Sequence, residues 1–214
     1  MGALTGRSIA AEDKRRLILD AAVRVFAHRG YHTSRVGDIT AEAGVAHGLL
    51  YHYFSSKDEL LETIFRETWT ELLEAIAEVE RADVPAREQL RQVAAIMLRS
   101  WLRQPDLVRV LVREIGRSPD LQRRLGEVGE VFAAIERIVA RGQREGELRR
   151  ELDPRLASYV VYGAVETILT GWVLAQLPGA EEDVGRAERA VVEIVCDGLA
   201  AEAAAASDTA PLLR

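Results

Sequence analysis

Residues 43–54 read AGVAHGLLYHYF, and the fold that we expect follows from this stretch. Gly44 ends a short helical segment, because glycine readily adopts the left-handed backbone conformation found after the last turn of a helix. A second short helix is predicted over residues 47–53, where Leu50 and Phe54 lie four residues apart and therefore share one face. Two short helices joined by a glycine-containing turn form a helix-turn-helix.

The segments on either side complete this unit. A first helix is predicted from about Glu12 to Arg29, and Gly30 follows its last turn. Its apolar face consists of residues at helical spacing: Leu17, Ile18, Ala21, Ala22, Val25 and Phe26. The second helix is expected over residues 35–43, with Thr33 or Ser34 as its cap. Residues 56–59, Ser-Lys-Asp-Glu, form a capping box that opens a long fourth helix.

The rest of the chain also reads as helix, because good helix formers are abundant and no stretch alternates with strand period. Four prolines and the caps Ser118 and Asp153 divide it. The prolines are Pro85, Pro105, Pro119 and Pro154. Helices are predicted near residues 85–103, 106–116, 119–145, 154–177 and 181–205. Gly142 and Gly146 should weaken the end of the third. The predicted fold class is therefore all-α.

Charge is divided unevenly along the chain, whose net charge is −6. Residues 1–57 carry eight Lys and Arg against five Asp and Glu, so the N-terminal part is mildly basic and the remainder acidic. This distribution suits a protein that places one end on a polyanion. No apolar run approaches the roughly 20 residues of a membrane span, and the N-terminus lacks a signal-peptide core, so we expect a cytoplasmic protein.

The second short helix has a polar side that could contact DNA. His47, Gly48, Tyr51 and His52 lie away from the face of Leu50. The second helix of a helix-turn-helix enters the major groove, where hydroxyl and imidazole groups can bond to bases or phosphates. A metal site at the two histidines is not expected, because no cysteine or acidic residue accompanies them at ligand spacing.

The stretch from Leu17 to Phe65 resembles the DNA-binding head of TetR-family regulators. The resemblance is carried by four segments in register: residues 26–31, 33–40, 43–54 and 56–61. It implies three DNA-binding helices, a helical ligand-binding body, and a homodimer formed by the last two long helices. The corresponding domains are residues 1–56 for DNA binding, 57–206 for ligand binding and dimerisation, and a disordered tail at 207–214.

The resemblance also implies DNA contacts at seven positions: Thr33, Arg35, His47, Gly48, Tyr51, His52 and Lys57. Thr33, Arg35 and Lys57 match positions that touch phosphates, and the other four match the reading helix. His47 stands where the family often has lysine. Ala46 replaces the serine or threonine that often caps the reading helix, and a missing cap costs about 1 kcal/mol.

No motif marks the ligand site, so its candidates are apolar or aromatic mid-helix residues and one carboxylate: Trp69, Leu73, Met97, Trp101, Phe132, Tyr159, Tyr162 and Glu166. Each could instead be plain core, and Glu166 could face solvent or an arginine. Four arginines in the middle of the chain could meet an anionic ligand such as an acyl-CoA, or form a solvated face: Arg99, Arg103, Arg109 and Arg113.

The dimer would use two apolar features of the last helices. Small residues of the first would permit close approach: Gly163, Ala164 and Gly171. An apolar stripe lies on the second: Val191, Val192, Ile194, Val195 and Leu199. Such a dimer would present two reading helices to successive major grooves, so its operator should be palindromic.

The expected function is regulation of transcription: a dimeric repressor that binds double-stranded DNA and is released by a small-molecule effector. We expect no cofactor and no metal. An enzyme is the less favoured alternative, because the chain lacks the nucleophile-elbow, phosphate-loop and zinc-protease motifs. A non-catalytic helical interaction protein is the other alternative, and it predicts no salt-dependent affinity for DNA.

Overall fold

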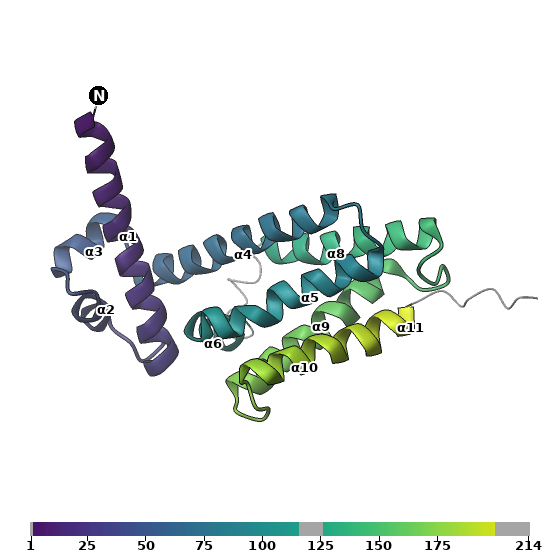
Figure 1. Ribbon diagram of the computed structural model, residues 1–214. Helices are drawn as coiled ribbons and strands as arrows, with labels where there is room; N and C mark the ends of the chain where they lie inside the picture. Colours follow the sequence, from purple (N-terminus) through teal and green to yellow (C-terminus); the bar gives the residue numbers. More distant parts are fainter. Residues whose placement is uncertain (1, 116–125, 200–214) are drawn as a thin grey trace, which may run out of the picture.

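The computed structural model describes residues 2–115 and 126–199, which form helices joined by short turns (Figure 1). The helices are α1 (Gly2–Arg29), α2 (Val36–Ala43), α3 (His47–Tyr53), α4 (Lys57–Arg81), α5 (Ala86–Arg103), α6 (Pro105–Ile115), α8 (Gly126–Glu145), α9 (Pro154–Val173), α10 (Glu181–Val191), a π-helical stretch (Val192–Cys196) and α11 (Asp197–Leu199). The all-α prediction is confirmed.

The helices form a head and a body. In Figure 1, α1 to α3 gather at one end, and α4 leads from them into an elongated bundle with α5, α8, α9 and α10. We call α1–α3 the head and the helices from α4 onward the body. The short helix α6 packs against α1 of the head and against α5 and α9 of the body. It therefore lies at the junction of the two parts.

Most predicted boundaries agree with the structure, and the exceptions have local causes. Helix α1 begins at Gly2 rather than near Glu12, since no proline interrupts the preceding residues. Helix α9 ends at Val173, because the chain turns back and the Gln176 amide donates to the Gly171 carbonyl (2.8 Å). The Ser118 cap and the tail from residue 207 lie outside the described residues.

The capping predictions are partly confirmed. Ser56 accepts from the Glu59 amide (3.1 Å), but the Glu59 carboxylate bonds back to the Ser55 amide (2.7 Å), one residue earlier than in a capping box. Thr33 and Ser34 do not cap α2, because their hydroxyls donate to carbonyl groups of the preceding turn. Arg35 occupies the cap position instead, and its amide donates to the carboxylate of Asp38 (2.8 Å).

Gly142, predicted to weaken the end of its helix, allows close packing between α5 and α8. Gly142 is buried in α8, and a Cβ at this position would lie 2.6 Å from Ala86 Cβ and 2.8 Å from Leu148 Cδ1. The missing side chain lets the start of α5 approach α8. Gly146, with φ +80°, then ends α8 in the left-handed conformation.

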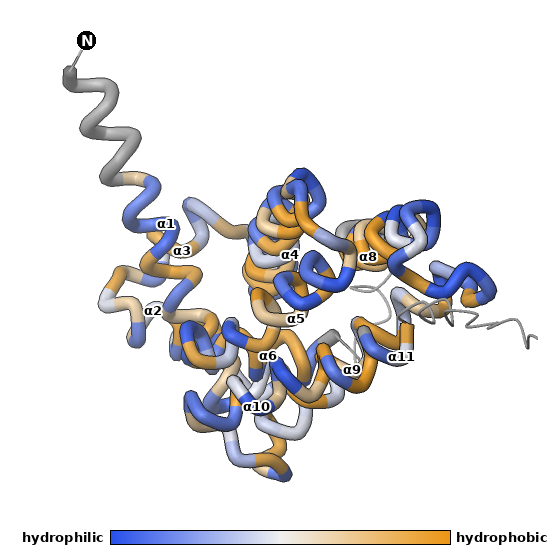
Figure 2. The backbone as a smooth tube through the Cα atoms, turned by 45° about the vertical axis from the view of Figure 1, so that its right-hand side comes forward, coloured by the Kyte–Doolittle hydropathy of each residue, from blue (hydrophilic) through white to orange (hydrophobic). Residues whose placement is uncertain are grey.

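Helix α9 has apolar residues on two faces. Among the described helices it is the one whose length and hydropathy would suffice to cross a membrane, but Val161, Val165 and Trp172 are buried within the chain. Leu156 and Val160 lie on the other face and are 68% and 59% exposed. In Figure 2, hydrophobic and hydrophilic residues alternate in short blocks along the body helices, as expected where one face is buried.

The predicted dimer residues need correction. Four of the five apolar residues near the end of the chain are buried in this chain's own core: Val191, Val192, Val195 and Leu199. Ile194 is 76% exposed. Gly171 is buried, and the space beside it is filled by Leu177, whose Cδ1 would lie 2.7 Å from an added Cβ. The stripe was misread because an amphipathic pattern does not tell which chain covers the apolar face.

Candidate DNA-binding and effector sites

The helix-turn-helix has the predicted form. Gly44 ends α2 with φ +66°, and the Val45 amide donates to the Thr40 carbonyl (3.0 Å), which closes the turn. Leu50 and Phe54 are buried in the head, so α3 is held by the face expected from the sequence. The opposite side of α3 is left to solvent.

Four predicted contact residues lie on that exposed side. His47, Gly48 and His52 are exposed, and the Tyr51 side chain is 51% exposed. The rings of His47 and Tyr51 pack edge to face, with centroids 5.4 Å apart, so the two side chains form one surface. A Cβ on Gly48 would meet nothing within 4 Å, so the helix backbone is open to a close partner.

Thr33 and Arg35 are exposed in the segment that leads into α2, whereas Lys57, at the start of α4, bonds to the head. Lys57 Nζ donates to the carbonyl oxygens of Tyr31 (2.6 Å) and Ser34 (3.0 Å) and lies 4.3 Å from the centre of the Tyr31 ring. Lysine has three N–H donors, so only one remains for a phosphate.

Sequence reasoning missed the role of Tyr31. Its ring is buried against Phe26, and its hydroxyl donates to Asp58 in the first turn of α4. Burial and the Asp58 carboxylate raise the pKa of Tyr31. Together with Lys57, this residue joins the end of α1 to the start of α4 and so fixes the head on the body. The only sequence signal was an aromatic residue directly after Gly30.

Three contacts cross the junction of head and body, from α6 to the end of α1 and to the turn that follows it. Arg113 Nη1 donates to the Ala27 carbonyl oxygen (2.9 Å), and His28 Nε2 lies 3.2 Å from an Asp106 oxygen. His32 Nε2 lies 3.8 Å from the carboxylate of Glu114, a residue that is 5% exposed. A displacement of α6 would therefore disturb its contacts with the head directly.

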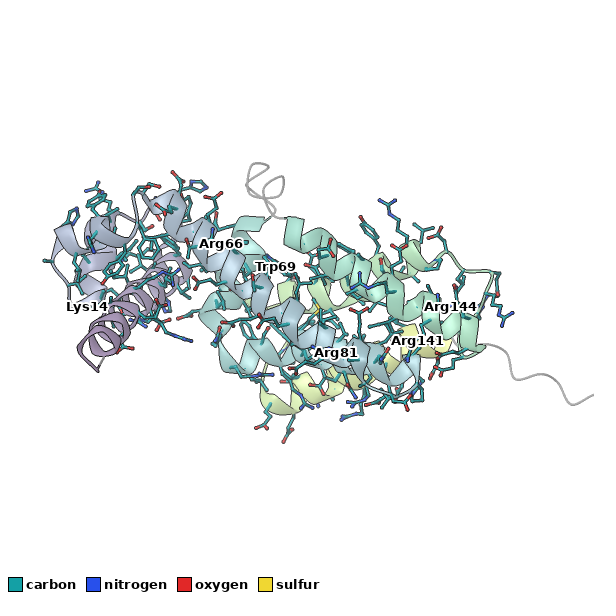
Figure 3. The ribbon with its side chains drawn as sticks, turned by 90° about the horizontal axis from the view of Figure 1, so that it is seen from above. Lys14, Arg66, Trp69, Arg81, Arg141 and Arg144 are labelled. Atoms are coloured by element: carbon teal, nitrogen blue, oxygen red, sulfur yellow. The ribbon has the colours of Figure 1, made fainter. Side chains whose placement is uncertain are left out.

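The body contains a cavity of about 330 Å³ between α4, α5, α6 and α9. Its lining is mainly apolar: Trp69, Leu72, Ala75, Ile96, Met97, Leu107, Val108, Leu111, Val112 and Leu169. Glu71, Arg103, Tyr162 and Glu166 supply polar groups. Figure 3 labels Trp69 near the middle of α4. A cavity of this size and lining suits a small apolar ligand.

Of the eight ligand-site candidates, four line the cavity and four do not. The four that line it are Trp69, Met97, Tyr162 and Glu166. Leu73 packs against the core instead. Trp101 Nε1 donates to the Gly179 carbonyl (3.0 Å), beside the connection of α9 to α10. Phe132 stacks on Tyr159 with ring centroids 4.3 Å apart, between α8 and α9.

The sequence missed the contribution of α6. Four residues of this helix, Leu107, Val108, Leu111 and Val112, line the cavity. They recur at helical spacing, which is typical of a buried face, but such a pattern does not indicate that the face borders a cavity. Of the four arginines considered for an anionic ligand, Arg103 lines the cavity, whereas Arg99 is paired with Glu188 (2.5 Å).

The polar groups of the cavity are linked electrostatically. Burial, with a smaller contribution from the Glu166 carboxylate, raises the pKa of Tyr162, so its hydroxyl is neutral and can donate a hydrogen bond. The indole nitrogen of Trp69 is buried and has no acceptor among the described residues. A buried donor without an acceptor costs free energy, which a ligand acceptor would recover.

Comparison with known proteins identifies the chain's relatives. The family described as bacterial regulatory proteins, tetR family, matches residues 18–64, and the family described as YsiA-like protein, C-terminal region, matches residues 65–184. The chain belongs to the TetR family. The first match contains the whole helix-turn-helix, and the second contains every residue that lines the cavity.

Relatives of the TetR family cover nearly the whole chain. The fatty acid metabolism regulator protein of Bacillus subtilis is 30% identical over 85% of this chain and 93% of its own length. The repressor KstR2 of Rhodococcus jostii is 26% identical over 87% and 91%. The structure of FadR from Bacillus subtilis with stearoyl-CoA has a TM-score of 0.77 and 28% identity, over 86% of this chain and 99% of that one.

Membership of the TetR family gives the general function. The chain is a ligand-responsive, DNA-binding regulator of transcription that acts as a dimer on operator DNA, as the sequence predicted. The family consists of regulators rather than enzymes. Helix α3 is its candidate reading helix, and the cavity is its candidate effector site.

Proposed function

We propose that this chain is a repressor whose effector is the CoA thioester of a fatty acid or another apolar acid. The observation that carries the proposal is the apolar cavity between α4, α5, α6 and α9, which has room for an alkyl chain or a ring system. The relative that is 30% identical regulates fatty acid metabolism, and the similar FadR structure holds stearoyl-CoA.

Helix α6 supports a mechanism for release from the operator. Leu111 lines the cavity, whereas Arg113 bonds to the head. A ligand in the cavity that favours a different position of α6 therefore favours a different position of the head. The ligand shifts the population of head positions by no more than its difference in affinity for them.

We infer that the operator contacts come from the exposed side of α3 and from the start of α2. His47, Gly48, Tyr51 and His52 would reach the major groove, and Thr33, Arg35 and the remaining donor of Lys57 would reach phosphates. The exposed apolar residues Leu156 and Val160 of α9, with Ile194, support a dimer face at this side of the body. The operator would then be palindromic, and the protein would work in the cytoplasm.

The test begins with a selection of genomic fragments by the purified protein, followed by titration of a selected site against scrambled DNA at several salt concentrations. Dodecanoyl-CoA and stearoyl-CoA should release the selected site, while CoA alone should not. Tyr51→Phe should weaken operator binding about five-fold or more without loss of thermal stability, because the exposed hydroxyl acts only on DNA.

A second variant tests effector binding separately from operator binding. Ala75→Phe fills the cavity, so it should weaken thioester binding and leave operator binding intact. Thr70→Phe, at an exposed position of the same helix outside the cavity, is the matched control. If both thioesters leave the operator complex unchanged at saturating concentration, the proposed effector class is wrong.

A further inference from the structure

A second cavity, of about 410 Å³, lies in the cleft between head and body. Its walls come from α1, from α4, and from the corner where α5 ends and α6 begins. Five residues line both this cleft and the effector cavity: Thr68, Glu71, Arg103, Gln104 and Leu107. The two cavities therefore adjoin, and a ligand longer than the effector cavity would enter the cleft.

The cleft differs from the effector cavity in chemistry. Most of its lining residues are charged: Glu12, Arg15, Arg16, Asp20, Arg24, Glu67, Glu71, Arg103 and Asp106. Burying an alkyl chain here would remove water from charged groups without replacing its hydrogen bonds. A ligand that fills both cavities must therefore be apolar at one end and polar at the other.

Several charges in the cleft are already neutralised. Arg15 is paired with Glu67, Arg24 with Glu42 (2.6 Å), and Asp106 accepts from Arg109 (2.5 Å). Within residues 2–115 and 126–199, Arg16 and Arg103 are not paired in this way.

Both guanidinium groups are free to bind a ligand. Arg16 on α1 and Arg103 at the end of α5 are exposed and donate to no carboxylate in residues 2–115 or 126–199. Guanidinium groups bind phosphate oxygens through two parallel hydrogen bonds. Arg103 lines both cavities, so it stands where an apolar ligand would pass from one to the other.

The remaining groups suit the other parts of a CoA. Asp20 and Glu71 line the cleft and can accept hydrogen bonds from amide and amino groups. The first turn of α6, which begins at Pro105, also lies at the cleft, and a helix N-terminus favours anions. These features add to the two free arginines.

We propose that the cleft between head and body is a second subsite of the effector site, which binds the phosphorylated end of the thioester through Arg103 and Arg16. This inference rests on the proposed function, which supplies the thioester. Its consequence is regulatory: the effector touches α1 itself, so it acts on the DNA-binding head directly as well as through α6.

The test compares two probes that share an acyl chain and a thioester. Dodecanoyl-CoA carries the phosphates, and dodecanoyl-N-acetylcysteamine lacks them. Calorimetric titration of the dimer should show that Arg103→Gln weakens the binding of dodecanoyl-CoA about ten-fold. This is the loss expected when a hydrogen bond between charged groups is removed. Arg103 also lines the effector cavity, so its loss should weaken binding of the truncated probe much less than binding of dodecanoyl-CoA. Arg16→Gln, which changes the cleft alone, should weaken dodecanoyl-CoA binding and leave binding of the truncated probe unchanged.

The matched control is Arg144→Gln, which removes the same charge from an exposed position of α8, at the end of the body away from the head (Figure 3). It should leave both affinities unchanged. If Arg103→Gln weakens both probes equally, or neither, the subsite is refuted while the effector class stands. If the wild-type dimer binds neither probe but still binds its operator, both the proposed effector class and the proposed subsite are refuted.

Hydrogen exchange gives a readout that does not depend on a variant. Dodecanoyl-CoA should slow exchange of the amides of residues 12–24 of α1, which line the cleft, whereas the truncated probe at equal saturation should not. Equal protection by both probes would mean that the phosphorylated end does not reach α1.

Discussion

Arg113 of α6 donates a 2.9 Å hydrogen bond from Nη1 to the carbonyl oxygen of Ala27, in the last turn of α1. Its chain neighbour Val112, together with Leu111, lines the effector cavity. Consecutive residues of one short helix therefore touch the candidate ligand site and the DNA-binding head. This arrangement makes α6 a direct connection between the candidate effector site and the head.

Removal of this hydrogen bond should weaken the coupling between the two sites. In Arg113→Met, the ratio of operator affinities without and with saturating effector should fall about ten-fold, because a bond to a charged group is lost. Effector affinity in the absence of DNA should stay the same. Fluorescence anisotropy with labelled operator measures the ratio. Arg186→Met, at an exposed position of α10, is the control. A ratio like that of the wild type would exclude this contact from the coupling.

Gly48→Ala should separate stability from DNA binding. The added Cβ meets nothing within 4 Å, and alanine favours helix by about 0.5–1 kcal/mol, so Tm should rise by about 1–4 °C. Operator affinity should fall, since the methyl group would stand where the proposed DNA contact brings the α3 backbone close to the groove. Gly44→Ala provides the contrast: with φ +66° it should cost about 1–2 kcal/mol. Unchanged operator affinity in Gly48→Ala would show that α3 does not approach DNA at this residue.

Two glycines of α8 should respond in opposite directions to the same substitution. Gly142→Ala forces a methyl group against Ala86 and Leu148 and should cost about 1–3 kcal/mol. Gly129→Ala lies at an exposed position where a Cβ meets nothing within 4 Å, so it should stabilise the helix slightly. Chemical denaturation of both variants measures the difference. A Gly142→Ala protein as stable as the wild type would mean that α5 and α8 can separate without cost.

Acid should remove the stabilising effect of one carboxylate in α5. Hydrogen bonds from Arg91 (2.6 Å) and Gln92 (2.9 Å) lower the pKa of Glu88 to about 2. Because the folded value lies below the unfolded one of about 4.3, the contribution is complete above that pH and is lost as the pH falls toward 2. The Tm difference between wild type and Glu88→Gln should therefore shrink between pH 5 and pH 3.

The control for this pH dependence is Glu78→Gln, which removes an exposed carboxylate of α4 outside that network. Its Tm difference from the wild type should change less over the same range. A Glu88→Gln difference that is constant with pH would mean that the carboxylate keeps its ordinary pKa in the folded chain.

Local signals were enough to predict the head. The Gly44 turn, the spacing of Leu50 and Phe54, and the Ser56 cap each act within a few residues, so each is legible in the sequence. The Thr33 and Ser34 caps were misassigned for a related reason. A hydroxyl between two helices can bond to either one, and the choice depends on the path of the chain between them.

The candidate effector site was predicted only in part. Met97 and Trp101 lie one turn apart on α5, yet Met97 lines the cavity and Trp101 bonds to Gly179, far along the chain. Both are apolar mid-helix residues, so the pattern could not separate them. The difference depends on where α6 and the α9–α10 connection pack, which are contacts between distant parts of the chain.

The helices, the Ser56 cap and the exposed side of α3 could be predicted from the sequence, because helix periodicity and capping depend on neighbouring residues. Which apolar faces meet, which faces leave a cavity and the bonds from Lys57 to the head depend on the tertiary structure. Those outcomes depend on close packing between distant segments, and a change of one turn in any helix would exchange the residues that line the cavity for residues of the core.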